Sequence, residues 1–511
     1  MSNFEPIVIQ LLDNEYWWGG IVAHGHQMPY DAGSNIREEL FGNIWGNQAC
    51  PLLVSSKGRY VWSEEPFAFE FKDGRLTIDN IRSKIELGEG QGSLRGSYLA
   101  ACGKFFPPSG KTPNELSFTA PQYNAWIDML RHPTQEKVLK YAQAILDAGM
   151  PPGVLVIDDW WHRNNGTWRF DKETFPDPKA MVDRLHKQGF LVMVWLTDYV
   201  TPDTREFLFL KDKGFIFADE KKAPLIERWW NGYGAILDLS NPGAFAWMQE
   251  QMDELVRQFG IDGFKLDGGD PFHYRNVKKS FEPRTPNGHC EDFVRLGMKY
   301  DLAEFRACWK FGGQHLMQRV RDKYHGWSEG GFADIIPSSL AQGIMGYPYS
   351  CPDMVGGGED TDFLSLGTSF EQELFVRWAQ CSTFFPIIQY SNLPSRVLGG
   401  EPLKIVLELV KLRMKLGPEI LELARQAART GEPIMRYMAY VFPGEGIEAV
   451  IDQYMLGDKY LVAPVMAKGA TSRKVKFPHG SWRGDDGNTV TGPCEMEVQA
   501  PLARLPWYAR V

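Results

Sequence analysis

The chain has 511 residues, of which 43% are hydrophobic and 13% aromatic, and its formal net charge is −9 without long runs of either sign. This length exceeds what a single hydrophobic core supports and predicts about two to four domains. The acidic balance supplies no basic patch for nucleic acid or for an anionic membrane surface, so we expect neither as a partner.

The chain shows no sign of export, membrane insertion or metal binding. It lacks both a charged leader with an apolar core and an apolar run long enough to cross a bilayer, so we expect a soluble, cytoplasmic protein and leave a homo-oligomer open. The seven cysteines are scattered without a Cys-x-x-Cys pair, and we expect reduced, mostly buried thiols. No metal-ligand pattern emerges, so we expect no metal and no cofactor.

Residues 1–115 consist of short alternating runs broken by Gly, Pro, Asn and Asp, a pattern typical of an antiparallel β-domain. The sequence leaves open whether aromatic and imidazole groups of this region, namely Trp17, Trp18 or His26, pack inside it or close over a neighbouring site. The expected strands are residues 6–12, 59–62, 68–71, 76–78 and 96–102.

Residues 116–411 alternate between apolar strands and amphipathic helices, which predicts a parallel βα architecture. Charged residues close most strands, and no Gly-x-Gly-x-x-Gly turn follows the first, so a barrel is favoured over an open sheet. The expected strands are 153–159, 190–198, 263–267 and 302–306, and the expected helices are 133–148, 178–188 and 242–259.

Residues 412–511 predict a terminal β-domain that follows a helix over about 411–430. Its expected strands are 460–464, 473–477 and 497–499.

The strand that ends at Asp267 is the strongest functional signal. Chemistry on a parallel barrel takes place at the C-terminal ends of the strands, and alternation places Lys265 and Asp267 on the same face. Asp267 is therefore our candidate nucleophile. The alternative is an aspartate that caps the next helix.

A second carboxylate is needed if the reaction is glycoside hydrolysis with retention, which uses two carboxyl groups about 5–5.5 Å apart. We choose Asp322, which lies in the polar, basic and aromatic stretch 318–327. The alternative is a surface ion pair between Asp322 and Arg319, Arg321 or Lys323.

Other strand-end side chains suit a sugar, because carboxylates accept hydrogen bonds from hydroxyls, cations hold the nucleophile ionised and aromatic faces pack a ring. Helix capping, core packing and structural ion pairs are the alternatives. The candidate substrate-binding residues are Asp158, Asp159, Trp195, Asp198, Lys265 and Arg306.

Several motifs in order resemble glycoside hydrolase family 31 across most of the chain: residues 156–160, residues 264–269, and Asp322 with Trp327 five residues later. The resemblance implies a (β/α)8 TIM barrel over 116–411, flanked by an N-terminal β-sandwich over 1–115 and a C-terminal β-sandwich over 412–511. It also implies that Asp267 is the nucleophile and Asp322 the acid/base, with Trp327 in the substrate site. Asp353 would be mainly architectural.

One departure from the family bears on the substrate. Family α-glucosidases carry Arg-Asn-His after the segment matched by residues 384–386, whereas this chain has Gln389-Tyr390-Ser391. The replacement resembles the branch that contains α-galactosidases, in which Arg306 resembles a substrate-contacting arginine.

We therefore expect a retaining, exo-acting α-glycosidase that hydrolyses a terminal nonreducing α-linked sugar of an oligosaccharide or small glycoside. Among these substrates, we expect α-galactosides. The alternatives are an α-glucosidase, an α-xylosidase or a transglycosidase of the same family. A noncatalytic carbohydrate-binding protein is a more distant alternative, and a metal-dependent hydrolase lacks a ligand set.

Overall fold

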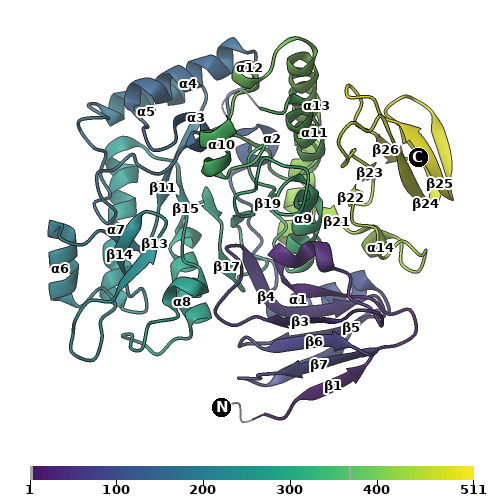
Figure 1. Ribbon diagram of the computed structural model, residues 1–511, viewed down its shortest axis with the longest axis horizontal. Helices are drawn as coiled ribbons and strands as arrows, with labels where there is room; N and C mark the ends of the chain where they lie inside the picture. Colours follow the sequence, from purple (N-terminus) through teal and green to yellow (C-terminus); the bar gives the residue numbers. More distant parts are fainter. Residues whose placement is uncertain (1–3, 367–369) are drawn as a thin grey trace.

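The computed structural model describes residues 4–366 and 370–511. It places a central α/β barrel between an N-terminal and a C-terminal sheet-rich domain, which confirms the expected fold class (Figure 1). Within the described residues, no helix combines the length and apolar content that a membrane crossing requires. All seven cysteines are free thiols, and six of them are buried.

The barrel is an eight-stranded sheet in the order β19-β18-β16-β15-β11-β10-β9-β20, and each neighbouring pair is parallel. The backbone amide of Ile387 donates to the carbonyl of Ser350 over 3.1 Å, which joins the two ends of the sheet. The strands are β9 Gln122–Asn124, β10 Val154–Ile157, β11 Leu191–Leu196, β15 Gly263–Leu266, β16 Ala303–Phe305, β18 Met317–Arg319, β19 Ser350–Cys351 and β20 Gln389–Tyr390.

Helices surround the barrel, and the three predicted from the sequence are confirmed as α4 Gln135–Asp147, α5 Pro178–Lys187 and α7 Pro242–Phe259. Each begins after a residue whose side chain accepts a hydrogen bond from a first-turn amide, which satisfies a donor that the helix leaves free. The other barrel helices include α3 Trp126–Met129, α6 Arg205–Lys213, α8 Pro286–Arg295, α9 Ile335–Ile344, α10 Asp360–Leu366, α11 Gln372–Ser382 and α12 Pro394–Val397.

A small sheet is inserted between β11 and α7. It has the order β12-β14-β13, and its hairpin turns at Trp230 and Asn231. Its strands are β12 Tyr199–Val200, β13 Ile226–Trp229 and β14 Gly232–Ile236.

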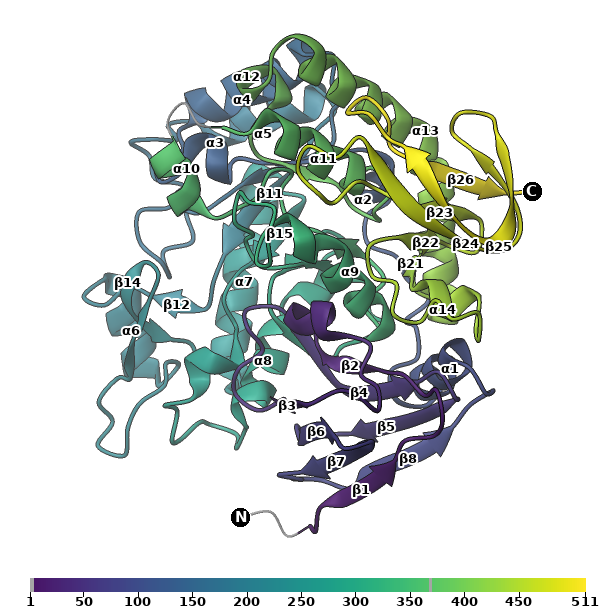
Figure 2. The same cartoon turned by 45° about the vertical axis from the view of Figure 1, so that its right-hand side comes forward.

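The N-terminal domain contains two sheets, of order β1-β7-β6-β3 and β17-β4-β5-β8, with β2 paired to β4. The strand β17 Cys308–Trp309 belongs to the barrel segment of the chain, so the second sheet joins the two domains. The short 3₁₀ helix η1 Val22–Gln27 lies against α9 (Figure 2). The strands are β1 Ile7–Gln10, β2 Trp17–Ile21, β3 Ile36–Glu39, β4 Gln48–Ser55, β5 Arg59–Ser63, β6 Ala68–Lys72, β7 Arg75–Asp79 and β8 Ile85–Glu89.

The prediction of a strand over residues 96–102 is wrong, because this segment lies in the helix α1 Leu94–Phe105. The hydroxyl of Ser93 accepts a hydrogen bond from the amide of Gly96 over 3.1 Å and caps the helix. The buried residues Leu94, Tyr98, Ala101 and Cys102 follow the helical period rather than the alternation of a strand.

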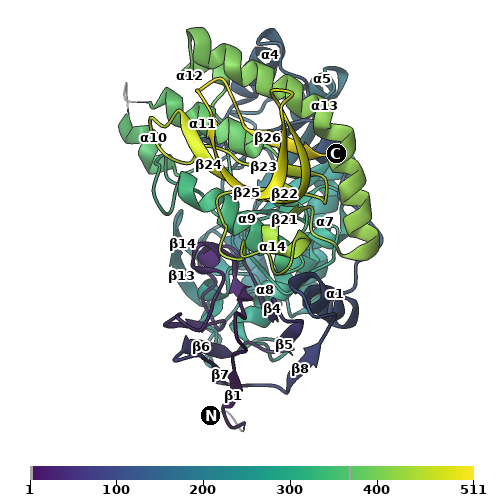
Figure 3. The same ribbon diagram turned by 90° about the vertical axis from the view of Figure 1, so that its right-hand side faces the viewer.

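The C-terminal domain is one antiparallel sheet of order β21-β22-β23-β26-β24-β25. It follows α13 Gly400–Thr430, which starts earlier than predicted and contains the expected domain boundary at 411/412. Arg377 and Gln380 of α11 donate to the carbonyls of Ala500 and Leu502, which fixes the sheet to the barrel (Figure 3). The strands are β21 Met435–Arg436, β22 Tyr454–Leu456, β23 Tyr460–Val462, β24 Ser472–Gly484, β25 Thr489–Gln499 and β26 Trp507–Arg510.

Candidate active site

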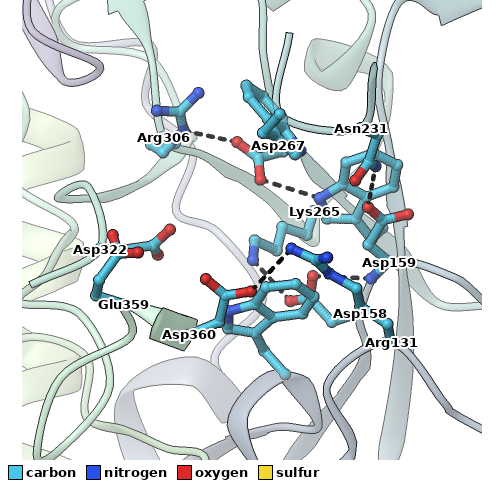
Figure 4. A pocket seen from close by; sticks show the side chains of 13 residues that line it. Arg131, Asp158, Asp159, Asn231, Lys265, Asp267, Arg306, Asp322, Glu359 and Asp360 are labelled. Carbon is cyan, nitrogen blue, oxygen red and sulfur yellow. Dashed lines mark hydrogen bonds and ion pairs between the residues drawn. The ribbon is translucent and has the colours of Figure 1, made fainter. Parts of the chain in front are cut away.

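A cavity of about 190 Å³ opens at the C-terminal ends of the barrel strands (Figure 4). It brings together all the predicted site residues except Asp198 and Trp327. Its lining residues are Trp126, Arg131, Asp158, Asp159, Trp195, Trp230, Asn231, Lys265, Asp267, Arg306, Asp322, Glu359 and Asp360.

Asp267 follows β15 directly and is held by several donors. Arg306 Nε donates to Oδ1 over 2.6 Å, and Trp195 Nε1 donates to Oδ2 over 3.0 Å. Burial alone would raise the pKa of this carboxyl, but the surrounding cations, with Arg306 first, hold the pKa well below its usual range. Asp267 is therefore a fixed carboxylate that stays ionised at neutral pH.

A buried ion pair lies beside this carboxylate. Lys265 Nζ and Asp158 Oδ2 are 2.6 Å apart, and both side chains are at most 5% exposed. Burial lowers the pKa of Lys265, but the charges of Asp158, Asp267 and Asp322 together outweigh this effect and the net shift of the pKa is upward. Lys265 therefore stays protonated and paired with Asp158 at the end of the cavity formed by β10 and β15.

Asp159 lies next to this pair, and Nε2 of His162 lies 3.8 Å from its Oδ1. Burial lowers the pKa of His162 to about 3, so this imidazole carries no charge at neutral pH. Asn231 Nδ2 donates to Asp159 Oδ2 over 2.5 Å, and the amide of Trp160 donates to Oδ1 over 2.7 Å. Burial raises the pKa of Asp159 to about 7, although the Asn231 hydrogen bond opposes the shift. This carboxyl therefore changes its charge near neutral pH.

Asp322 faces the cavity from the loop after β18. Arg319 Nη1 donates to its Oδ1 over 2.7 Å and to Asp353 Oδ1 over 2.6 Å. Figure 4 shows Asp322 and Glu359 on one side of the cavity and Asp158 and Asp159 on the other. The loop side of the cavity is rich in carboxyl groups, since Asp322, Glu359 and Asp360 all line it. Burial, and secondarily the charge of Asp322, raises the pKa of Glu359.

Asp198 and Trp327 lie outside the lining of this cavity. Asp198 is buried and accepts a hydrogen bond from the hydroxyl of Tyr274 over 2.5 Å, while burial raises its pKa to about 7. Trp327 Nε1 donates to Glu371 Oε1 over 3.0 Å. Both are placed to support neighbouring segments. Asp353 is fully buried beside Arg319, in agreement with an architectural role.

Six cavity residues were missed by sequence reasoning: Trp126, Arg131, Trp230, Asn231, Glu359 and Asp360. Trp230 and Asn231 form the turn of the inserted hairpin, where the double tryptophan at 229–230 was an available signal. Glu359 and Asp360 follow three glycines, and Arg131 Nη2 donates to Asp360 over 3.2 Å. Arg131, Trp230, Asn231 and Glu359 lie in loops or turns, and Trp126 and Asp360 begin the short helices α3 and α10, so no strand or helix period predicts which way these side chains point.

The residues of the N-terminal domain named from the sequence separate into two groups. Trp17 and Trp18 are buried in the core, so they pack within the protein rather than over the cavity. His26 lines a different cavity. As for metals, the described part of the chain contains no group of three or more His, Cys, Asp or Glu side chains that could hold an ion.

Known proteins resemble the chain in both sequence and fold. It is 31% identical over 423 residues to the myogenesis-regulating glycosidase of Mus musculus, covering 81% of this chain and 58% of that protein. It is 26% identical over 502 residues to an alpha-xylosidase of Lactiplantibacillus pentosus, covering 90% of this chain and 61% of that one. The chain therefore spans only about three-fifths of the length of these relatives.

Two solved structures share the fold. The structure of a family 31 alpha-xylosidase from a soil metagenome, in complex with xylose, superposes with a TM-score of 0.85 at 22% identity and covers 99% of this chain and 79% of that one. A family 31 dextranase of Flavobacterium johnsoniae, in complex with glucose, gives 0.84 at 18% identity and covers 99% and 66% of the two chains.

Two domain descriptions match the sequence in order. Residues 113–325 match the glycosyl hydrolases family 31 TIM-barrel domain, and residues 431–511 match the glycosyl hydrolase family 31 C-terminal domain. The first match contains the barrel strands that end at Asp158 and Asp267 and extends past Asp322, and the second contains the C-terminal sheet. The chain therefore belongs to glycoside hydrolase family 31.

Proposed function

We propose that this protein is a retaining, exo-acting α-glycosidase in which Asp267 is the nucleophile and Asp322 the general acid and base. One observation carries the proposal: an ionised, hydrogen-bonded strand-end carboxylate shares a cavity with a second carboxyl on an adjacent loop. Retaining hydrolysis needs this pair, because one group attacks the anomeric carbon while the other protonates the leaving oxygen.

Double displacement assigns a role to each group. Asp267 attacks the anomeric carbon of the sugar to form a β-linked glycosyl-enzyme, and Asp322 gives its proton to the departing oxygen. Asp322 then removes a proton from water, which attacks the same carbon and releases Asp267. Arg306 and Trp195 hold one carboxylate oxygen each and thereby orient the nucleophile.

The polar end of the cavity is suited to a single nonreducing sugar. The volume of about 190 Å³ is below the range of ~300–1,000 Å³ typical of ligand pockets, which favours one sugar ring over an extended chain. Asp158, Asp159 and Lys265 offer acceptors and a donor to ring hydroxyls, and Trp195 supplies an aromatic surface.

An α-galactoside is the proposed substrate. In this chain the side chain of Gln389 donates to Gln122 and Glu304 over 2.8 and 3.0 Å inside the barrel, and none of the residues 389–391 lines the cavity. The segment that carries Arg-Asn-His in family α-glucosidases therefore offers no hydroxyl contact here. This difference supports a glycone other than glucose.

An α-xyloside is the second candidate, because a cavity of this size also admits a pentose and one of the relatives described above is named an alpha-xylosidase. Transfer to a sugar acceptor would use the same two carboxyl groups. These alternatives keep the mechanism and change the sugar or the acceptor.

The test is the initial rate on p-nitrophenyl α-galactoside, α-glucoside and α-xyloside. We expect α-galactoside cleavage to dominate and Asp267→Asn to lower kcat by ~10⁴-fold or more, because no carboxylate remains to attack. Asp262→Asn is the matched control and should leave kcat unchanged. Asp262 lies at the N-terminal end of β15, opposite to Asp267, and does not line the cavity.

The outcomes separate the parts of the proposal. Activity on the α-glucoside or the α-xyloside alone would overturn the assignment of galactose as the glycone but leave the mechanism unchanged. Unchanged activity in Asp267→Asn would refute the nucleophile assignment, and inactivity on every glycoside would favour the carbohydrate-binding alternative.

A further inference from the structure

Arg319 is a buried cation that joins Asp322 to the barrel. It is the last residue of β18, and its side chain is 0% exposed. Its Nη1 donates to Oδ1 of Asp322 over 2.7 Å and to Oδ1 of Asp353 over 2.6 Å. Its Nε lies 3.7 Å from Oε1 of Glu304, which belongs to β16 and is also fully buried. Three carboxyl groups therefore share one guanidinium.

Asp353 is held in an unusual backbone conformation. Its φ of 78° lies in the left-handed region, which residues other than glycine rarely adopt. Its carboxylate is fully buried, and a Cβ added at Gly358 would lie 2.8 Å from Oδ1 and 2.9 Å from Oδ2. Strain of this kind persists only where the surroundings impose it and gathers at functional sites, so the placement of this carboxylate points to a functional constraint.

The carboxylate of Asp353 also binds the chain on the far side of Asp322. Its Oδ2 accepts a hydrogen bond from the amide of Lys323 over 2.8 Å. The carbonyl of Lys323 in turn accepts from the two amides of residues 358–359 over 3.1 and 3.2 Å. The loop that carries Asp322 is thus tied to a barrel strand through Arg319 and to a second loop through Lys323.

The bond from Arg319 distinguishes the two oxygens of Asp322. Because Oδ1 accepts the N–H of Arg319, a proton carried by this carboxyl is favoured on Oδ2. Oδ2 has no hydrogen-bond partner within residues 4–366 and 370–511, and Asp322 lines the active-site cavity (Figure 4). Oδ2 is therefore the oxygen that can exchange a proton with a group in the cavity.

The charge of Arg319 is shared in a way that suits an acid. An arginine that faced Asp322 alone would favour the ionised carboxylate, whereas a general acid has to hold a proton. Here Asp353 and Glu304 face the same guanidinium. Burial lowers the pKa of Arg319, but the surrounding carboxyl groups hold the pKa well above its usual range. Arg319 therefore stays charged and bonded while Asp322 gains and loses its proton.

We propose that Arg319 is a positioning residue for the general acid and base: it fixes Oδ1 of Asp322 and leaves Oδ2 toward the leaving oxygen. Asp353 and Glu304 hold the guanidinium in place. The inference rests on the proposed function. In the first step Oδ2 gives its proton to the departing oxygen as Asp267 bonds to the anomeric carbon, and in the second step Oδ2 takes a proton from the attacking water. Arg319 does not line the cavity and keeps its own proton in both steps.

The test compares two leaving groups on one glycone, because only the poor leaving group needs the acid. Melibiose and p-nitrophenyl α-galactoside form such a pair, and the corresponding pair serves for another glycone. Arg319→Lys keeps the buried positive charge but loses the planar fork of the guanidinium. We expect kcat/KM to fall by about 10- to 100-fold on the disaccharide and by no more than about threefold on the p-nitrophenyl glycoside.

Asp353→Asn tests the same link from its other end. An amide has only one acceptor oxygen, so it cannot serve both Arg319 and the amide of Lys323. We expect a loss of about three- to tenfold in kcat/KM, again confined to the disaccharide. Arg377→Lys is the matched control, since Arg377 is 1% exposed, donates to backbone carbonyls and does not line the cavity. It should lower stability and leave the ratio between the two substrates unchanged.

Asp322→Ala separates this inference from the proposed function. A selective loss of disaccharide cleavage in Asp322→Ala, without such selectivity in Arg319→Lys and Asp353→Asn, would overturn the inference alone. An equal loss on both substrates in Asp322→Ala would refute the acid role of Asp322 and with it the proposed function.

Crystal structures decide the geometry without turnover. In Arg319→Lys we expect the carboxylate of Asp322 to leave its present position while Asp267 stays in place. This displacement would support the inference even if no glycoside were cleaved, and an unmoved Asp322 would overturn it. The structure of Asp353→Asn gives the same answer if Arg319→Lys does not fold.

Discussion

The two sides of the active-site cavity are built differently. Asp267 stands at the end of a barrel strand, its side chain is 13% exposed and its neighbours Arg306 and Lys265 are cations. Asp322 stands on a loop, its side chain is 36% exposed, and Glu359 lines the cavity beside it.

This difference matches the two chemical roles that we propose. A nucleophile must stay ionised and fixed, and buried cations on rigid strands provide both properties. A general acid must exchange its proton during each cycle, which contact with solvent permits. Substitutions on the two sides should therefore change different properties, such as kcat, KM or stability, and by different amounts.

The largest expected effect on the loop side comes from Asp322→Ala. We expect kcat to fall by about 10²–10⁴-fold on a disaccharide, since the departing sugar alkoxide needs a proton. The loss should be much smaller on a p-nitrophenyl glycoside, whose phenolate leaves without help. Steady-state rates on the two substrates measure the difference, and an equal loss on both would assign Asp322 a structural role.

The strand side can be tested through the stability of its buried ion pair. Lys265→Met leaves the carboxylate of Asp158 buried without its cation and should lower the free energy of unfolding by about 3–5 kcal/mol. The double variant Lys265→Met/Asp158→Leu removes both charges and should lose less than Lys265→Met alone. Urea unfolding monitored by circular dichroism measures both. The single variant Asp158→Leu completes the comparison, and a double variant as unstable as the sum of Lys265→Met and Asp158→Leu would show that the charges are uncoupled.

The strand side was also the more predictable from sequence. Asp267, Lys265 and Asp158 were found because strands alternate and barrel strands end at the active site, so their positions follow from a regular period. Trp195 and Arg306 belong to the same pattern. The predictions of α4, α5 and α7 succeeded for a similar reason, since apolar spacing and an N-terminal proline or cap specify a helix.

The loop side was predicted only in part. Asp322 was chosen from the polar and aromatic stretch 318–327 and supported by its resemblance to a family motif. Glu359 and Asp360 were missed, because their placement depends on contacts distant in sequence. One such contact is the hydrogen bond from Trp126 Nε1 to the carbonyl of Gly358 over 3.1 Å. The helix α1 was mistaken for a strand because its short buried face was interpreted with the wrong period.

Asp159 sharpens the contrast within the strand side, since burial raises its pKa to about 7 while cations keep Asp267 ionised. As the pH falls through about 7, Asp159 becomes protonated and accepts weaker hydrogen bonds from a sugar hydroxyl, so KM should rise by up to about tenfold per pH unit. Asp159→Asn should abolish this dependence. Asp198→Asn should retain it, because Asp198 has a similar pKa but does not line the cavity. The measurement is KM as a function of pH for the wild type and both variants. A pH dependence that persists in Asp159→Asn would contradict the prediction.

The smallest expected effect concerns the link between the loop side and the N-terminal domain. Asn47 is fully buried, and its Oδ1 accepts a hydrogen bond from the amide of Arg321, next to Asp322. Asn47→Ala leaves that amide unpaired and should free the Asp322 segment, lowering kcat by about three- to tenfold with little change in KM.

The matched control for this variant is Gln453→Ala. Gln453 is a buried amide that bonds both backbone groups of Lys476 in the C-terminal domain, so its loss should lower stability by a similar amount and leave kcat unchanged. An equal fall of kcat in both variants would mean that Asn47 acts only through global stability. A fall confined to Asn47→Ala would show that the N-terminal domain positions the acid, as the barrel strands position the nucleophile.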